Sequence, residues 1–423
     1  MSAETITAPA YVPGTGKRVI PDHVPPELVF EPKYEEPNTL IDPFSVTRNI
    51  YDELPPVFYW PRPSPGRYDG AWVVTRYEDI REVYQNEELY SARNAANFQG
   101  TVGETFKVLP QSVDAPEHGP YRMMLTPWFT PKAINAMEQE VRKIINDLID
   151  SFIDKGECDV AHDFGRIYPV KVFLNLMGFP HERLEDFLSW EYAILADKRD
   201  IESIRWGSRH AIDYLRSFIE EVRAKPNDKL ASAIVHGKIN GRPTTEDEII
   251  GMMFMLFLAG LDTVSATSSL IFRRLALDPK LQQTLRDNPD KMPLAIDEFL
   301  RVMPVVNASR AVKKDHEIRG VKIKAGDYIL CYTMAGNFDP EEFAEPRTLK
   351  LDRSPNRHFS LASGPHLCLG QHLARREMRM GVAEFLRRIP AFKFKPGADM
   401  TVYPGQIAAR HVPVVWDPTG VVK

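Results

Sequence analysis

The sequence Gly364-Pro-His-Leu-Cys-Leu-Gly370 (GPHLCLG) places a lone cysteine directly before a predicted helix that runs from Gln371 to Arg388. A cysteine in front of a helix N-terminus lies in a field that favours its thiolate form, and backbone N–H groups there can hydrogen-bond the sulfur. The two glycines permit tight turns and the close approach of a large flat ligand. The stretch therefore predicts a loop that presents Cys368 as a thiolate.

Two other interpretations of Cys368 follow from the residues alone. A buried structural cysteine is a common fate for an unpaired cysteine in a folded protein. A zinc site could use His366, Cys368 and His372, but a fourth ligand is missing nearby. The choice among a thiolate ligand, a structural cysteine and a zinc ligand depends on the rest of the chain.

The composition is that of a globular protein from a reducing compartment. The 423 residues are 43% hydrophobic and 26% charged, with a formal net charge of -5 and no strongly basic arm, which argues against nucleic-acid binding. Cys158, Cys331 and Cys368 stand far apart, which favours the cytoplasm over a disulfide framework. Residues 1–25 do not resemble a signal peptide, and the apolar run 252–259 is too short to span a bilayer. We therefore expect a cytoplasmic protein without a membrane partner.

The pattern along the chain predicts an α+β protein in which helix dominates. Residues 1–37 are rich in proline and predict an extended arm, and residues 38–423 predict a single domain. Helices come first and strands last, without regular alternation, which indicates a mixed fold. Residues 88–115 predict a long irregular loop. The expected strands cover residues 71–75, 317–323, 328–333 and 407–416, and the expected helices include 77–84, 134–152, 170–176, 184–195, 204–222 and 229–235.

The longest predicted helix runs from Thr245 to Leu277, and Thr244 or Thr245 can cap it. No proline interrupts it, and its middle is apolar on nearly every face, so we expect it to be long, central and buried. It nevertheless contains Asp262, and an acid there is costly unless it is paired or functional. A satisfied ion pair for Asp262, and a Thr263 hydroxyl bonded back to the carbonyl four residues earlier, are the alternatives to a functional role.

The pattern G-x-H-x-C-x-G at residues 364–370 resembles the haem-binding loop of cytochromes P450. The resemblance implies the P450 fold, haem b (heme b, iron protoporphyrin IX) as the cofactor, and Cys368 as the axial thiolate ligand that favours O–O cleavage. Two positions depart from the family pattern: Leu361 stands where phenylalanine is usual, and Ala362 where glycine is usual. These departures bear on the packing beside the thiolate and on the reduction potential.

The stretch Ala259-Gly-Leu-Asp-Thr263 resembles the oxygen-binding groove of the P450 central helix. The resemblance implies that Asp262 and Thr263 are catalytic and deliver protons to bound dioxygen. It also places Gly260 where the helix opens beside the cofactor. Together these residues favour oxygen activation over simple haem carriage.

Glu298 and Arg301 match the E-x-x-R pair of the family, which is buried and holds the core beneath the cysteine loop. From the residues alone, a routine surface pair would be the preferred interpretation. Residues 337–346 resemble the irregular segment that follows this pair in the family. Three motifs in the family's order make a chance resemblance improbable.

Haem propionates need cationic or hydrogen-bonding partners, because buried carboxylates are unfavourable when unpaired. The family uses a His-x-x-x-Arg motif, which is His118 and Arg122 in this chain. It also uses an arginine after the E-x-x-R pair, here Arg310, and the histidine of the cysteine loop. The expected haem contacts are therefore His118, Arg122, Arg310 and His366, with Gly260, Gly364 and Gly370 close to the cofactor.

Similarity to the camphor hydroxylase branch of bacterial P450s also outlines a substrate pocket. Phe106 stands where the camphor enzyme has a hydrogen-bonding tyrosine, and phenylalanine cannot donate to a ketone. We therefore expect hydroxylation of a different medium-sized apolar substrate, a terpenoid or an ionone-like norisoprenoid. Asn97 and Gln406 are candidates for a polar contact. The expected apolar wall consists of Phe106, Met255, Leu258, Ala259, Val306, Ala308 and Ile407.

Enzymes of that branch take electrons from NADH through a flavoprotein reductase and a [2Fe–2S] ferredoxin. No flavin or ferredoxin domain fits within this chain, so the resemblance implies that both are separate proteins. A basic patch would steer an acidic ferredoxin to the cysteine side of the haem. The expected patch consists of Arg122, Arg375, Arg376 and Arg379. A solvated helix face is the alternative interpretation of the last three.

Two other functions remain compatible with a haem-thiolate site. One is an enzyme that uses peroxide or needs no dioxygen, although such enzymes often lack the acid–alcohol pair that Asp262 and Thr263 provide. The other is a non-catalytic haem sensor, although sensors usually carry a signalling or DNA-binding domain that is not evident here.

Overall fold

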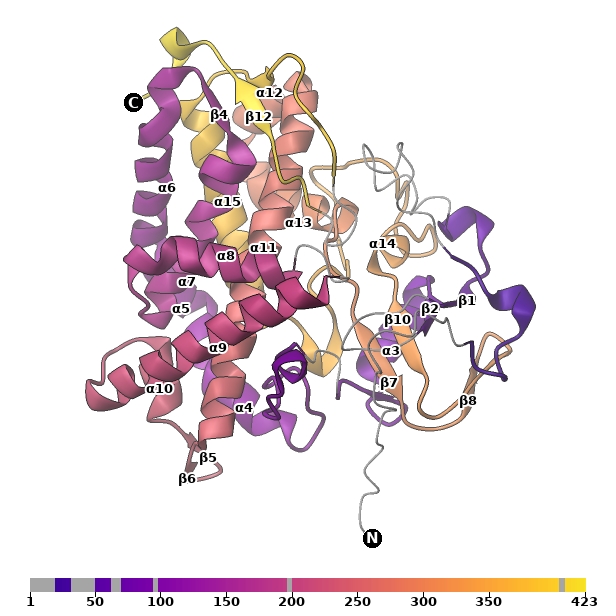
Figure 1. Ribbon diagram of the computed structural model, residues 1–423. Coiled ribbons are helices and arrows are strands. Elements are labelled where there is room, and N and C mark those ends of the chain that lie inside the picture. Colours follow the sequence, from indigo (N-terminus) through magenta and orange to yellow (C-terminus); the bar gives the residue numbers. More distant parts are fainter. Residues whose placement is uncertain (1–19, 32–49, 62–69, 94–97, 196–199, 403–407) are drawn as a thin grey trace.

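A computed structural model describes residues 20–31, 50–61, 70–93, 98–195, 200–402 and 408–423. Figure 1 shows a large helical part and, beside it, a smaller part built around a β-sheet. Helices dominate the middle of the chain, and the sheet combines strands from early and late segments. The expected mainly helical α+β class is confirmed.

The helices on which the site depends have the following bounds: α3 (Tyr77–Gln85), α4 (His118–Leu125), α5 (Pro131–Ala136), α6 (Glu138–Phe152), α7 (Ile167–Met177), α8 (Leu184–Leu195), α9 (Ile201–Ala224), α10 (Leu230–Val235), α11 (Glu246–Leu277), α12 (Pro279–Asp287), α13 (Met292–Val302), α14 (Thr333–Gly336) and α15 (Gln371–Arg388). The strands are β1 (Val57–Trp60), β2 (Ala71–Val74), β3 (Tyr90–Ser91), β4 (Glu157–Asp159), β5 (Lys238–Ile239), β6 (Arg242–Pro243), β7 (Ser309–Val312), β8 (His316–Ile318), β9 (Val321–Ile323), β10 (Tyr328–Cys331), β11 (Lys393–Phe394) and β12 (Pro413–Val415).

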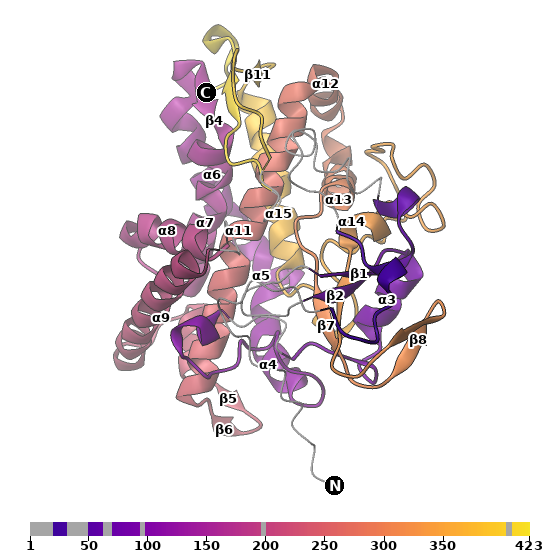
Figure 2. The ribbon, with the colours of Figure 1, turned by 45° about the vertical axis from the view of Figure 1, so that its right-hand side comes forward.

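The central helix α11 begins as the sequence predicts. The Thr245 side chain accepts from the Glu248 N–H, and the Glu248 carboxylate accepts from the Thr245 N–H, which completes a capping box. In the described part of the chain, α11 alone is long and apolar enough to cross a membrane, but 72% of its most apolar window is buried inside the protein. It is therefore the core helix, and Figure 2 shows it running through the molecule with α15 beside it.

The loop before α4 is fixed against α11 by a close backbone contact. The Leu109 N–H donates to the Gly251 carbonyl at 3.3 Å. A Cβ atom at Gly251 would lie 2.1 Å from the Lys107 carbonyl oxygen, so only glycine allows this approach. The segment that contains Phe106 is thereby fixed against the central helix.

The five-stranded sheet has the order β1-β2-β10-β7-β3. Strand β10 pairs in parallel with β2 and antiparallel with β7, so segments far apart in the sequence meet in its centre. Arg310 lies in β7, opposite Ile329 of β10. The sheet therefore carries one of the expected haem contacts.

Three sequence-based element boundaries are wrong. The helix expected over residues 134–152 is broken at Met137 into α5 and α6. The single strand expected over 317–323 is the hairpin β8–β9, because Arg319 and Gly320 adopt positive φ angles of 51° and 80° and reverse the chain. In the described part of the C-terminal tail, regular strand is confined to β12.

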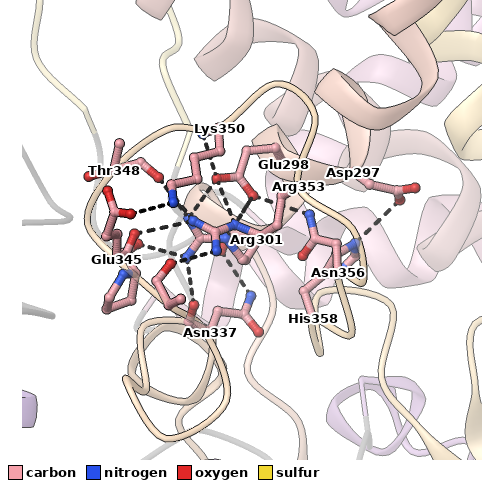
Figure 3. A network of polar contacts seen from close by, with 12 residues as sticks. Asp297, Glu298, Arg301, Asn337, Glu345, Thr348, Lys350, Arg353, Asn356 and His358 are labelled. Carbon is pink, nitrogen blue, oxygen red and sulfur yellow. Dashed lines mark hydrogen bonds and ion pairs between the residues drawn. The ribbon is translucent and has the colours of Figure 1, made fainter.

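Glu298 and Arg301 form a fully buried ion pair on α13 (Figure 3), as the resemblance implied. Arg301 Nε and Nη2 each donate to a Glu298 carboxylate oxygen at 2.8 Å. Arg353 Nε adds a third charged bond to Glu298 at 2.9 Å, and the Lys350 N–H donates at 2.9 Å. The carboxylate is therefore saturated by donors from α13 and from a segment some fifty residues later in the chain.

The same network reaches the cysteine loop through Asn337. Arg301 Nη1 donates to the Asn337 carbonyl at 2.8 Å, and Asn337 Nδ2 donates to the Arg301 carbonyl at 3.0 Å. The Asn337 side chain then accepts from the Phe359 N–H at 2.8 Å and donates to Ser360 Oγ at 2.9 Å. Residues 337–360 are thereby held on α13 directly before the cysteine loop begins.

Replacing Arg301 by methionine should lower the free energy of unfolding by about 3 kcal/mol or more, because it leaves the buried Glu298 carboxylate short of a charged partner. The matched control is Arg81→Met, which breaks an exposed pair with Glu78 at the same i,i+3 spacing. That control should cost less than about 1 kcal/mol. Denaturant unfolding measures both variants, and equal losses would contradict a structural role for the buried pair.

Candidate active site at the cysteine loop

Two backbone hydrogen bonds shape the loop around Cys368. The Cys368 N–H donates to the Leu361 carbonyl at 2.9 Å, and the Leu367 N–H donates to the Gly364 carbonyl at 3.0 Å. Helix α15 then begins at Gln371, with Gly370 as its N-cap. Every residue from 361 to 370 keeps some exposed surface, unlike the adjoining core. The loop therefore leaves Cys368 half-buried directly before α15.

Burial raises the pKa of the Cys368 thiol, while the Gly370 N–H, which bonds the sulfur, and the charges of Arg122 and Arg375 oppose that rise. Burial raises the pKa of Cys331 to about 12. Cys158 is also buried, and its thiol pKa is raised further. Of the three cysteines, Cys368 is the one that combines a backbone donor with two cations, which suits a sulfur that binds a metal as the thiolate.

The expected haem contacts come together from three separate elements: α4, β7 and the cysteine loop. The rings of His118 and His366 lie 4.4 Å apart between centroids. Arg122 Nη2 donates to the Leu367 carbonyl at 2.6 Å, which fixes α4 against the loop. Arg310 is buried and lies over the Tyr84 ring at 5.4 Å. The sequence-based grouping of these four residues agrees with their positions.

Both histidines offer a buried nitrogen with no hydrogen-bond partner, Nε2 in each case. Burial, together with the charges of Arg310, His118 and Arg122, lowers the pKa of His366 to about 3, and burial also lowers the pKa of His118. Buried nitrogen atoms of this kind require a partner. The propionates of a haem would supply acceptors for two arginines and two histidines, so the residues present fit that group.

Acidic side chains also approach His366. Ligand atoms of Glu87, Asp114 and His366 all lie within 4.8 Å of one another. The Asp114 carboxylate accepts from the Ser91 hydroxyl at 2.5 Å and from the Ala92 N–H at 2.8 Å. Asp114 is therefore held by its own neighbours, and His366 lies between these acids and the arginines.

The middle of α11 is open where the rest of the helix is buried. Ala259 is exposed and Asp262 and Thr263 are half-buried, whereas Leu258, Leu261 and Val264 are buried. The Thr263 hydroxyl donates to the Ala259 carbonyl at 3.1 Å. This is the local bond that the sequence offered as an alternative to function, and it orients the hydroxyl on the open face of the helix.

A second acid, Glu191 of α8, lies near Asp262. Burial raises the pKa of Glu191 well above its ordinary range, and the nearby charge of Asp262 raises it further. Arg166 approaches Glu191, with 3.4 Å between Nη2 and Oε2. Glu191 and Arg166 were missed by sequence reasoning, although an acid between Trp190 and Tyr192 in an apolar helix is the same signal that marked Asp262.

The three glycines expected beside the cofactor differ in what they face. A Cβ atom at Gly260 would lie 2.5 Å from Cδ2 of Phe173, so this glycine allows α7 to pack on α11 and does not face a ligand. A Cβ at Gly364 would lie 2.5 Å from the Tyr84 carbonyl oxygen, whereas a Cβ at Gly370 would meet nothing within 4 Å. Gly260 and Gly364 therefore allow close packing against Phe173 and Tyr84, and the cofactor role expected for the three glycines stays a prediction.

The expected substrate residues are only partly brought together. Phe106 is buried, lies edge-on to Phe254 at 5.9 Å, and shares a hydrophobic cluster with Leu258 and Met255. Ala308 instead packs in the cluster beside the sheet, and Val306 is 43% exposed. Ala259 lies on the open face of α11. Asn97, Gln406 and Ile407 lie outside the described residues.

Two arginines of the expected docking patch are engaged in ion pairs. Arg375 Nε lies 2.7 Å from the Asp297 carboxylate, and Arg376 pairs with Glu138 of α6. Arg122 reaches the cysteine loop, as described, and Arg379 is half-buried on α15. The patch is therefore less positively charged than its four arginines suggest.

A separate hollow of about 690 Å³ lies on another part of the surface, lined by residues of α6, β4 and β12. It contains Cys158 but none of the residues brought together around Cys368. The chemistry described above does not depend on it.

Comparison with known proteins identifies relatives along nearly the whole chain. The family model described as cytochrome P450 matches residues 207–406. A probable cytochrome P450 127A1 of Sinorhizobium fredii is 37% identical over 398 residues, which cover 92% of this chain and 94% of that protein. Cytochrome P450-terp of a Pseudomonas species is 27% identical and covers 88% of this chain and 92% of its own length.

Solved structures give the same result. The crystal structure of cytochrome P450 CYP101C1 superposes with a TM-score of 0.82 at 30% identity and covers 94% of this chain and 100% of its own. CYP101J2 gives a TM-score of 0.82 at 29% identity with the same coverage. CYP109E1 from Bacillus megaterium, solved in complex with testosterone, gives 0.80 at 25% identity over 90% of this chain and 99% of its own.

Replacing Gly364 by alanine should destabilise the protein through two effects that a control can separate. The left-handed backbone, with φ of 69°, should cost about 1–2 kcal/mol for any residue with a Cβ. The clash with the Tyr84 carbonyl adds to this cost. Gly320→Ala shares the positive φ but has open space, so it should show only the first effect in thermal unfolding. Equal losses in the two variants would mean that the Tyr84 contact is unimportant.

Proposed function

The chain belongs to the cytochrome P450 family and is a haem-thiolate monooxygenase, and we propose that it hydroxylates a medium-sized apolar molecule with electrons from a separate ferredoxin. One observation carries the proposal: Cys368, two unpartnered histidine nitrogens and two arginines converge on one site from α4, β7 and the cysteine loop. When bound, the haem iron supplies the activation of dioxygen. The protein supplies the ligand, the orientation and the protons.

Cys368 would hold the haem iron through its sulfur. Its sulfur accepts the Gly370 N–H, and Arg122 and Arg375 favour the anion. His118, Arg122, Arg310 and His366 would hold the propionates, which would satisfy the histidine Nε2 atoms. These residues would hold the haem at the cysteine loop.

Asp262 and Thr263 would hold and pass protons on the half-buried stretch of α11. The Thr263 hydroxyl can accept a proton on one side and donate on the other, and its bond to the Ala259 carbonyl fixes its position. Asp262 precedes it on the same half-buried stretch, so the pair brings an acid to a site that is otherwise apolar.

The substrate would be a terpenoid or an ionone-like norisoprenoid. Phe106, Met255 and Leu258 form an apolar surface on and beside α11, one turn before Asp262. Phe106 has no group to donate to a ketone, which disfavours camphor. An apolar wall of this kind selects by shape rather than by hydrogen bonds.

Electrons would come from NADH through a flavoprotein reductase and a [2Fe–2S] ferredoxin. The ferredoxin would dock on the cysteine side, where Arg122 lies against the loop and α15 carries Arg379. Arg375 and Arg376 would contribute less charge than the sequence suggested, because Asp297 and Glu138 neutralise them. Such a surface would steer an acidic partner modestly. We also propose a cytoplasmic location.

Cys368→Ala should abolish the optical spectrum of a thiolate-ligated haem in the purified protein, because no other sulfur would reach the iron. Cys158→Ala and Cys331→Ala are matched controls, since both thiols are buried and neither combines a backbone donor with two cations as Cys368 does. Both controls should keep the spectrum. A thiolate spectrum that survives in Cys368→Ala would overturn the ligand assignment.

Optical titration of the ferric protein tests the substrate class. Terpenoids and norisoprenoids should shift the haem band from the water-bound to the water-free form, whereas fatty acids should not. In Phe106→Tyr, a new hydroxyl can donate to the ketone of camphor, so camphor should bind about two- to tenfold more tightly. If fatty acids alone shift the band, or if the variant leaves camphor affinity unchanged, the pocket assignment is wrong.

A further inference from the structure

Three side chains that can bind a metal ion meet beside the cysteine loop. Ligand atoms of Glu87, Asp114 and His366 all lie within 4.8 Å of one another. In the described part of the chain, they form the one group of three or more His, Cys, Asp and Glu side chains that lie so close together. They come from the turn after α3, the loop before α4 and the cysteine loop. Three segments far apart in the sequence therefore supply a set of metal-binding donor atoms.

The Glu87 carboxylate contains an acceptor that the haem cannot satisfy. Its Oε1 atom is buried and has no hydrogen-bond partner. Buried polar atoms are normally satisfied, so this oxygen requires a partner. A haem propionate cannot supply one, because both groups are carboxylates and accept hydrogen bonds without donating them. A cation can, since carboxylate oxygens are common metal ligands.

The Asp114 carboxylate is already held in one orientation. It accepts from the Ser91 hydroxyl at 2.5 Å and from the Ala92 N–H at 2.8 Å, and only 5% of the surface of Asp114 is exposed. The Asp114 backbone carbonyl accepts from the His118 N–H at 2.9 Å. Hydrogen bonds of this kind orient the carboxylates that bind metals in proteins. The two carboxylate oxygens offer about four acceptor positions, so the two side-chain bonds leave positions for an ion.

His366 connects the two acids with the site of the cofactor. Its ring packs against that of His118, with 4.4 Å between centroids, which limits its rotation. An imidazole has two nitrogens, and one can bind a metal while the other makes a hydrogen bond. One nitrogen of His366 can therefore bind an ion beside Glu87 and Asp114 while the other bonds a haem propionate.

The cations near the two acids contact them only weakly. Arg93 Nε lies 3.6 Å from the Asp114 carboxylate, but the Arg93 side chain is 58% exposed and also approaches Glu117 at 3.7 Å. Lys313 Nζ donates to the backbone carbonyl of Glu87 at 2.6 Å and not to its carboxylate. A divalent cation would balance both acids at close range.

We propose that Glu87, Asp114 and His366 bind a divalent transition-metal ion of the zinc type, and that the bound ion makes the haem easier to reduce. Two carboxylates and an imidazole suit Zn²⁺, whereas Mg²⁺ and Ca²⁺ prefer oxygen ligands alone. Zinc binds such atoms at about 2.0–2.2 Å, so the three ligands must draw together. Asp114 is held by its hydrogen bonds, and the Glu87 side chain turns to close the site.

The effect on the haem follows from the two nitrogens of His366. A metal ion on one nitrogen fixes the proton on the other, which then donates to a propionate. The positive charge added beside the haem stabilises the reduced form, which carries one more electron. This second part rests on the proposed function, because it requires a haem held by His366. The metal site itself does not require that function.

Equilibrium dialysis of the purified haem-bound protein against zinc chloride tests the site. Wild type should bind one zinc ion per chain at this site, and Glu87→Gln should bind it at least about tenfold more weakly, because a ligand is lost. The matched control is Glu88→Gln, which changes the exposed neighbouring acid and should keep the wild-type affinity. Equal zinc affinity in wild type and Glu87→Gln would overturn the proposal.

A second variant leaves all three ligands in place. Ser91→Ala removes the hydroxyl that orients Asp114, so zinc should bind about 10- to 100-fold more weakly. A large excess of magnesium chloride should not displace zinc from wild type. Zinc bound at the exposed His372 is the competing explanation. Binding that is lost in His372→Ala and kept in Ser91→Ala would overturn the proposal.

Thermal unfolding shows whether Glu87→Gln fails only in binding. Without zinc, wild type and Glu87→Gln should unfold at similar temperatures. With zinc, the unfolding temperature of wild type should rise, because an ion that binds only the folded state stabilises it. An equal rise in Glu87→Gln would mean that zinc binds elsewhere and would overturn the proposal.

Redox titration with and without zinc tests the effect on the haem. The reduction potential of wild type should become more positive when zinc binds, and that of Glu87→Gln should stay unchanged at the same zinc concentration. An unchanged potential in zinc-saturated wild type would overturn the second part of the proposal. A protein that takes up no haem would refute the proposed function, while dialysis would still decide whether these three residues bind zinc.

Discussion

The site depends on the buried contact between Glu298 and Arg301. Removing both charges from water is unfavourable, and such a pair is stable only when further hydrogen bonds satisfy it. Here Arg353 and the Lys350 N–H add donors to the carboxylate, and the guanidinium bonds the Asn337 carbonyl. Each of these partners comes from the irregular segment that precedes the cysteine loop. The ion pair therefore fixes the position of a segment with little regular structure. Because the cysteine loop follows this segment directly, the position of Cys368 is fixed as well.

The central helix imposes the second constraint. Most of its residues are apolar and fill the core, yet Asp262 and Thr263 form a half-buried polar stretch at its middle. Buried polar residues follow on the same helix at Ser265, Thr267, Ser268 and Ser269. The helix backbone stays intact there, because the Thr263 hydroxyl bonds the Ala259 carbonyl on its own helix. The polar groups therefore disturb neither the capping of α11 nor its packing against α7.

The sequence predicted the parts of the fold and site that depend on local chemistry. A threonine cap at the start of α11, the uninterrupted length of this helix and the helix after the cysteine loop all follow from short stretches of residues. Orientation could not be predicted in the same way. The direction in which Gly260 faces depends on how α11 is rotated about its axis relative to Phe173 of α7. No local sequence pattern predicts that rotation. Glu191 was missed because its proximity to Asp262 depends on how two different helices are arranged. Its position between two aromatic residues is visible in the sequence, but the sequence does not give the relative positions of α8 and α11.

Two buried acids, Glu298 and Glu191, contact arginine side chains to different extents. Glu298 meets two guanidinium groups, Arg301 at 2.8 Å and Arg353 at 2.9 Å, and serves as a fixed anchor. Glu191 is approached by Arg166 at 3.4 Å, and burial raises its pKa well above the ordinary range. Burial disfavours a charged carboxyl unless cations and hydrogen bonds oppose it. The two close guanidinium contacts of Glu298 therefore explain how this acid can fix the segment before the cysteine loop.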